Sequence, residues 1–132
     1  MELTLHFGYY EIGMNYLGHA YFSTEKIFIG NMAGDSLIGV DVSALDEDLR
    51  AGISRHRLID QVTDSHEAFF EIRSMFTQSG LPYAGVFADL AIDWGIASRW
   101  SEYSGVEWHE FKESVYRRLE TGSRRIGNRP IR

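Results

Sequence analysis

Apolar residues recur at helical spacing along most of the chain, with polar residues at the intervening positions. A spacing of three or four residues is typical of amphipathic helices, and no segment of the main body alternates like a strand. We therefore predict an all-α fold, a compact bundle of five or six helices. The expected helices cover residues 16–22, 24–38, a segment from a cap at Ser43 or Asp46 to a break at Asp64, 65–77, 83–102 and 107–119.

The two ends of the chain depart from this periodicity. Residues 1–13 precede the first predicted helix and read as an N-terminal extension, in which alternating apolar residues equally allow a short edge strand. Residues 121–132 are basic and contain glycine without apolar periodicity, so we expect a mobile tail. One helical domain, residues 14–120, is predicted between the two ends.

Composition limits the classes of function that the chain can have. Its 132 residues make one domain, and an apolar content of 44% suits a buried core. The absence of cysteine excludes disulfides, thiolate metal sites and cysteine nucleophiles. A net charge of −6 argues against nucleic-acid binding, although clustered arginines allow an acidic protein partner. The sequence contains no apolar run of membrane-spanning length and no evident signal peptide, so we expect a cytoplasmic protein.

Histidine and aspartate residues at helical spacing are the strongest functional signal. His56, Asp60 and Asp64 follow one another at i, i+4 and i+8, which places them on one face of a helix. Asp89 and Asp93 repeat this spacing in an apolar segment, where a carboxylate is costly unless it is paired, protonated or bound to a cation. We expect a site for one or two divalent cations that activate water against a phosphate. The candidates are His19, Asp35, His56, Asp60, Asp64, Asp89 and Asp93, with Arg55 or Arg57 as a phosphate contact.

Several of these residues also have a purely structural interpretation. The glycines between residues 30 and 34 lack the lysine and the preceding strand of a phosphate loop, so we expect them to allow close helix packing. His66 and His109 show no such spacing and are assigned to the surface or to packing. The structural alternatives are a buried histidine bonded to a backbone carbonyl for His19, a turn residue for Asp35, a capping box with Glu67 for Asp64, and a surface pair with Asp60 for Arg57.

Four sequence blocks follow one another in a specific order. They are Asn15–His19, Gly30–Asp35, Gly52–Asp64 and Tyr83–Asp93, the last followed by Trp100. Their order and spacing resemble the bacterial acyl carrier protein phosphodiesterases, also named acyl carrier protein hydrolases. The similarity covers roughly residues 14–100, which makes it more specific than a single motif.

The resemblance implies a fold like that of the HD-domain metal phosphohydrolases and a manganese or magnesium cofactor. The implied reaction removes the 4′-phosphopantetheine group from holo acyl carrier protein by cutting its phosphodiester bond to a serine hydroxyl. The acidic recognition helix of acyl carrier proteins would suit the clustered arginines. We assign metal binding to His19, Asp35, His56 and Asp60, catalytic roles to Asp60, Asp89 and Asp93, and a phosphate contact to Arg57.

Two departures from the family pattern keep other functions open. Asp93 is followed by Trp94 where family members usually have histidine, and an indole has no lone pair for a metal. Family members also typically continue for several more helices, so the chain resembles a C-terminally truncated member. The alternatives are an inactive helical module that binds acyl carrier protein and a metal phosphohydrolase acting on a small phosphodiester. A homodimer would cover apolar faces left bare near Trp100, Tyr103 and Trp108.

Overall fold

The computed structural model describes residues 16–37, 39 and 41–127, and its regular structure is helical. The elements are α1 (Tyr16–Tyr21), α2 (Phe28–Met32), the 3₁₀ turns η1 (Asp35–Leu37) and η2 (Val42–Ala44), α3 (Glu47–Asp64), α4 (Glu67–Gln78), α5 (Ala84–Ser98), α6 (Trp100–Tyr103) and α7 (Trp108–Gly127). No strand occurs among the described residues, so the prediction of an all-α, multi-helix fold is confirmed. The predicted N-terminal extension and residues 128–132 lie outside the described residues.

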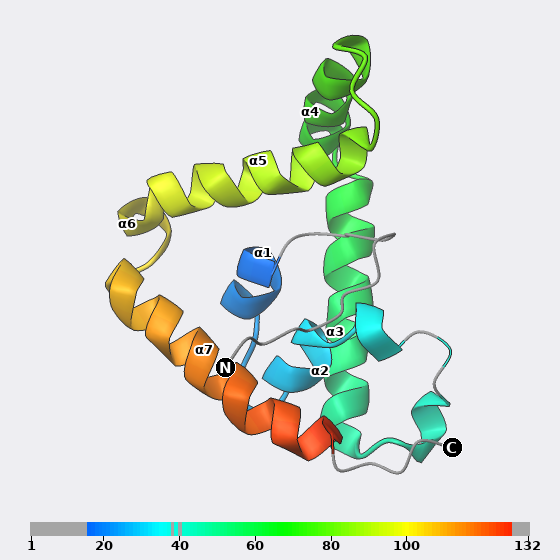
Figure 1. The fold of residues 1–132 in the computed structure, drawn as a ribbon, viewed down its shortest axis with the longest axis vertical. Helices are drawn as coiled ribbons and strands as arrows, with labels where there is room; N and C mark the ends of the chain where they lie inside the picture. The colour runs from blue at the N-terminus through cyan, green and yellow to red at the C-terminus, as the bar shows by residue number, and fades with distance from the viewer. Residues whose placement is uncertain (1–15, 38, 40, 128–132) are drawn as a thin grey trace.

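Helix α3 is the central support of the fold (Figure 1). The short helix α2 packs along α3, and α1 packs on α2. Helices α4 and α5 pack on each other at the C-terminal end of α3. The chain then runs round α1 through α5 and α6, and α7 returns to pack on α2. The short helices α1 and α2 are therefore enclosed between α3 and the later helices.

Two buried clusters hold α2 between α3 and α7. Ile29 packs against both of them, and burial of each large apolar side chain contributes about 1.5–3 kcal/mol. One cluster contains Ala20, Phe28 and Met32 and is covered by Phe111, Val115 and Leu119 of α7, and the other contains Leu45, Leu49 and Ile53.

Gly30 and Gly52 let α2 approach α3 closely. A Cβ atom on Gly30 would overlap the backbone carbonyl oxygen of Leu49, and one on Gly52 would overlap that of Ile27. A larger residue at either position would push the two helices apart. The prediction that glycine in this segment allows close helix packing is confirmed.

The boundary between α3 and α4 differs from the predicted capping box. Helix α3 continues through Asp64, and His66 caps α4 by accepting the Ala68 N–H at its Nδ1 atom, 3.0 Å away. Because the imidazole supplies this acceptor, Asp64 remains in the last turn of α3 and is not a cap. At the start of α3 the predicted cap is confirmed for Asp46, whose carboxylate accepts the Leu49 N–H at 2.9 Å.

Two predicted helices are interrupted. The helix expected over residues 24–38 is reduced to α2 and η1, and Gly34 between them lies against the ring of His56. The helix expected over residues 83–102 is divided into α5 and α6, because Arg99 leaves helical geometry with φ at −122°.

The last helix is longer than predicted. Helix α7 continues to Gly127, whereas the sequence predicted its end at Leu119 and a non-helical tail from residue 121. Gly122 explains part of the difference, because the absence of a Cβ atom lets this turn of α7 approach the side chain of Ile29. The helical turn that contains Gly122 therefore packs on α2.

Of the residues around which a bare apolar face was expected, Trp100 is buried, Trp108 is partly buried and Tyr103 is 48% exposed. Trp100 is 5% exposed, and its ring packs against Tyr21, Trp108 and Phe111. Its Nε1–H donates to the backbone carbonyl oxygen of Val106 at 2.7 Å. These contacts hold α6 against the beginning of α7.

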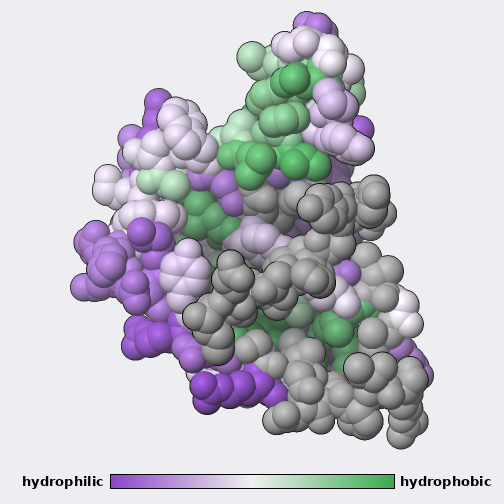
Figure 2. Space-filling model, in the orientation of Figure 1, coloured by the Kyte–Doolittle hydropathy of each residue, from purple (hydrophilic) through white to green (hydrophobic). Residues whose placement is uncertain are grey.

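An exposed apolar stripe follows α5 instead. Tyr83, Phe87, Leu90 and Trp94 are 72%, 38%, 52% and 73% exposed. The spacing of Phe87, Leu90 and Trp94 places them along one side of the helix, and Tyr83 precedes its first turn. Figure 2 shows hydrophobic residues gathered over α4 and α5 and hydrophilic ones over α7. Within the described ranges, no helix has the length and apolar content that a membrane span requires.

Candidate metal centre

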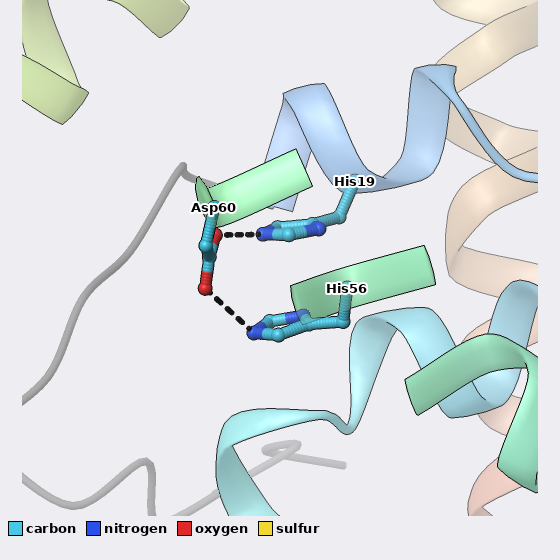
Figure 3. A group of neighbouring side chains, drawn as sticks. All are labelled: His19, His56 and Asp60. Carbon is cyan, nitrogen blue, oxygen red and sulfur yellow. Dashed lines mark hydrogen bonds and ion pairs between the residues drawn. The ribbon is translucent and has the colours of Figure 1, made fainter. Parts of the chain in front are cut away.

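Two buried histidines converge on one aspartate, as Figure 3 shows. His19 comes from α1, and His56 and Asp60 come from α3. The Nε2 atom of His19 lies 3.1 Å from Asp60 Oδ1, and that of His56 lies 3.2 Å from Asp60 Oδ2. The two rings stack with centroids 4.0 Å apart and planes inclined by 9°. The Asp60 carboxylate therefore bridges two parallel imidazoles.

Helix periodicity, a glycine and a second aspartate determine the surroundings of His56. His56 and Asp60 project from the same side of α3, as their spacing predicted. The ring lies directly against Gly34, where any Cβ atom would overlap it. Asp35, the first residue of η1, places Oδ1 3.0 Å from Nε2 of His56. This nitrogen atom thus faces two carboxylates from different elements.

Asn31 is a site residue that the sequence analysis missed. It is fully buried, and its Oδ1 accepts a hydrogen bond from Nδ1 of His19 at 2.8 Å. Its backbone carbonyl oxygen accepts one from Nδ1 of His56 at 2.7 Å. The signal that could have found it is an amide inside the apolar segment 27–32, because a buried amide requires hydrogen-bond partners.

Hydrogen bonds within the cluster outweigh the effect of burial on the pKa values of His56 and Asp60. Burial lowers the pKa of His56, but hydrogen bonds with Asp35 and Asp60 outweigh it and raise the pKa to about 10. Burial raises the pKa of Asp60, but hydrogen bonds from His19 and His56 outweigh it and hold that pKa well below its ordinary value. A protonated His56 therefore lies beside an ionised Asp60.

Asp89 of α5 adds a buried carboxyl group to the same region. The residue is 2% exposed, and its Oδ1 has no hydrogen-bond partner in the part of the chain that the structure describes. Burial, together with smaller contributions from the charges of Asp64, Asp60, Asp93 and Asp35, raises its pKa to about 8. The carboxylates of α3, α5 and η1 thus influence one another.

The sequence candidates fall into groups according to their contacts. The Asp64 side chain is mostly exposed. The loss of part of its hydration, together with the negative charge of Asp60, raises its pKa. Asp93 is half-buried, whereas Arg55 and Arg57 are exposed on α3. Of the two histidines, it is the ring of His56, not that of His19, that bonds a backbone carbonyl. Direct contacts join His19, Asp35, His56 and Asp60.

This donor set suits a divalent cation. One possible ligand atom from each of His19, His56 and Asp60 lies within 4.8 Å of the others. Atoms bound to a single ion through bonds of about 2.0–2.2 Å have a comparable mutual spacing. Imidazole nitrogen combined with carboxylate oxygen is a ligand set for manganese, iron or zinc.

Comparison with known proteins identifies the family of this chain. The family model described as acyl carrier protein phosphodiesterase matches residues 14–130, a range that contains every site residue above. The chain belongs to the acyl carrier protein phosphodiesterase family. No solved structure matches it.

Relatives that carry the family's name are distant from this chain. The acyl carrier protein phosphodiesterase of Photorhabdus laumondii is 29% identical over 91 residues, which are 67% of this chain and 46% of the relative. Those of Shigella boydii and Escherichia coli are 30% identical over 93 residues, which are 69% of this chain and 48% of the relative. The chain therefore spans about half the length of these relatives.

Proposed function

We propose that the protein is a metal-dependent phosphodiesterase that removes 4′-phosphopantetheine from holo acyl carrier protein. The observation that supports it is the convergence of His19 and His56 on Asp60, in a chain whose family is named for a phosphodiesterase acting on that carrier. Because the similarity covers only 46–48% of each relative, their activity is proposed for this chain and does not follow from family membership.

The proposed metal ligands are His19, His56 and Asp60, with Asp35 beside them. Manganese or magnesium is the proposed cation, and the two imidazole nitrogens favour manganese. When bound, such a cation lowers the pKa of coordinated water and offsets negative charge on the phosphate oxygens.

The remaining candidates are proposed to handle water and phosphate. Asp89 and Asp93, one turn apart on α5, would orient the attacking water. Arg57, exposed next to His56, would contact the phosphate through its guanidinium group. In the balanced reaction water adds to phosphorus, and the bond from phosphorus to the carrier's serine oxygen breaks. A proton from the water ends on that serine oxygen, which releases 4′-phosphopantetheine and the apo carrier.

The tryptophan at the position of the family's usual histidine lies outside the cluster. Trp94 is 73% exposed, whereas Asp89 on the same helix is 2% exposed. At about 100° per residue, the five positions between them leave an angle of about 140° around the helix axis, so the two side chains leave α5 in different directions. The contacts among the residues of α1, η1 and α3 therefore do not involve the indole, which supports an active site in this chain.

Mass spectrometry of the carrier tests the proposal. Incubation with Mn²⁺ and holo acyl carrier protein should remove the mass of 4′-phosphopantetheine from the carrier, and EDTA should prevent this loss. His56→Ala should abolish the loss, while Leu58→Ala, at an exposed position on the other side of α3, should retain it. Carrier binding without mass loss would instead indicate an inactive module. Turnover of a small phosphodiester alone would indicate a different substrate.

We also propose that a second copy of the chain covers the exposed stripe of α5. Spacings of four, three and four residues are those of a coiled-coil seam, and the stripe contains no charge that would repel a second copy. With ~200 Å² for a large side chain, its exposed fractions leave roughly 470 Å² per copy. A total of roughly 900 Å² lies at the small end for protein interfaces, so the expected dimer is weak and reversible.

Sedimentation velocity over a concentration series tests this dimer. The wild-type protein should shift from monomer to dimer as its concentration rises, and Leu90→Glu should remain monomeric. Tyr116→Glu, at a 59% exposed position on α7, is the matched control and should still dimerise. A wild-type protein that stays monomeric at its highest soluble concentration would contradict the proposal.

A further inference from the structure

Asn31 contacts both histidine rings, each through a different oxygen atom. Its side-chain Oδ1 meets Nδ1 of His19 at 2.8 Å, and its backbone carbonyl oxygen meets Nδ1 of His56 at 2.7 Å. A carbonyl oxygen only accepts hydrogen bonds, so Nδ1 donates in both rings. The orientation of the amide is determined as well, because Nδ2 donates to the backbone carbonyl oxygen of His19 at 3.0 Å.

We propose that Asn31 is the positioning residue of the metal centre, which holds the proton at Nδ1 of both rings and leaves both Nε2 atoms to bind one cation. This inference rests on the proposed metal-dependent function. A histidine that binds metal through Nε2 carries its proton on Nδ1, and the partner of that proton orients the ring. The two Nε2 atoms already face Asp60 at 3.1 and 3.2 Å. One residue of α2 thus orients ligands from α1 and α3.

Ser23 fixes the Asn31 amide in this orientation. Its Oγ accepts a hydrogen bond from Nδ2 of Asn31 at 2.7 Å and donates to the carbonyl oxygen of His19 at 2.6 Å. Rotation of the amide would exchange Oδ1 and Nδ2 and place an oxygen against the carbonyl oxygen of His19. Because Asn31 is fully buried, such a mismatch would be costly.

The two rings depend on Asn31 in different ways, which allows a specific test. Asn31→Leu removes the acceptor of His19 but keeps the backbone carbonyl that His56 uses. In ¹H–¹⁵N spectra of the metal-free protein, the Nδ1–H signal of His19 should broaden or vanish while that of His56 remains. Asn31→Asp keeps an oxygen for His19 and should restore its signal, at a cost in stability because its second oxygen faces the carbonyl oxygen of His19. Thermal unfolding shows whether each variant folds, and Ser23→Ala, which loosens the amide, should weaken the same signal if Asn31→Leu does not fold.

Mn²⁺ affinity connects this orientation to the metal centre. Asn31→Leu should bind Mn²⁺ roughly 10–100-fold more weakly than the wild type, and Asn31→Asp should lie between them. Unchanged affinity together with an unchanged His19 signal in Asn31→Leu would overturn the positioning role and leave the metal centre in place. A wild-type protein that binds no Mn²⁺, with both Nδ1–H signals present, would overturn the metal centre itself and with it the role of Asn31.

Discussion

Replacement of Asp89 by asparagine should stabilise the metal-free protein at neutral pH. Asp89 is 2% exposed, and its Oδ1 has no hydrogen-bond partner among the described residues. Burial and, to a smaller extent, the neighbouring carboxylates raise its pKa to about 8. Asparagine has nearly the shape of the protonated acid and carries no charge at any pH. The variant therefore removes the free-energy cost of holding a carboxyl group in this environment.

The sign and size of the effect follow from the two protonation equilibria of Asp89. Below its ordinary pKa of 3.8, the carboxyl group is protonated in the folded and the unfolded chain, so it makes no pH-dependent contribution. Above that value, the unfolded chain loses the proton while the folded chain keeps it until about pH 8. The free energy of unfolding of the wild type then falls by about 1.4 kcal/mol per pH unit. Between the ordinary pKa and about pH 7 the accumulated loss is roughly 4 kcal/mol. Desolvation of the asparagine amide reduces the expected gain to roughly 2–4 kcal/mol.

Urea unfolding of wild type and Asp89→Asn in EDTA, from about pH 5 to about pH 8, measures the difference in unfolding free energy. The difference should be small at the acidic end and widen steadily as the pH rises. Glu71→Gln, at an exposed position on α4, should change stability by less than about 0.5 kcal/mol throughout. A difference that does not grow with pH, or a variant less stable than wild type near neutrality, would refute the reasoning.

Other substitutions and conditions test separate parts of the structure. Gly34→Ala should destabilise the protein by about 1–3 kcal/mol and weaken Mn²⁺ binding because its Cβ would overlap the His56 ring, and unfolding and Mn²⁺ titration measure the two effects. Gly95→Ala, at a site in α5 with open space, is its control and should stabilise by up to ~1 kcal/mol. His66→Ala should cost about 0.5–2 kcal/mol in thermal unfolding through loss of the α4 cap, and His66→Asp should restore it. The stability that His56 contributes is complete below pH 6.5 and should be lost as the pH rises through about 10, since its pKa is raised in the folded state. His56→Gln should flatten this part of the profile, and an equally steep profile in the variant would exclude His56 as its source.

Contacts within one helix could be predicted from the sequence, whereas contacts between helices could not. His56 and Asp60 meet because a four-residue spacing brings side chains together on any α-helix. The approach of His19 depends on how closely α1 and α2 pack on α3, which the contact between Gly30 and Gly52 permits. Periodicity carries no information about that distance. The order of the four sequence blocks was the signal that assigned His19, His56 and Asp60 to one site from the sequence alone.

The errors occur where a local signal met a competing interaction. The capping box at Asp64 was a sound local pattern, but the His66 imidazole caps α4 two residues later. Trp100 was expected on a bare face, and the ring contacts between α6 and α7 bury it. Asn31 was overlooked because a single amide among apolar residues shows no periodicity. Its importance appears only when both histidine rings are placed beside it.

The protons held by this cluster link its stability to its proposed function. His56 keeps a proton between two carboxylates, and Asp89 keeps one because neighbouring negative charges and burial oppose its ionisation. A divalent cation held by His19, His56 and Asp60 would take the place of the proton on Nε2 of His56, and its charge would favour the ionised form of Asp89. A purely structural network would lose stability when one of its members is removed. In this protein, Asp89→Asn is instead expected to raise the stability of the metal-free form and to lower the affinity for Mn²⁺. These opposite effects on stability and on metal affinity distinguish a binding site from a structural cluster.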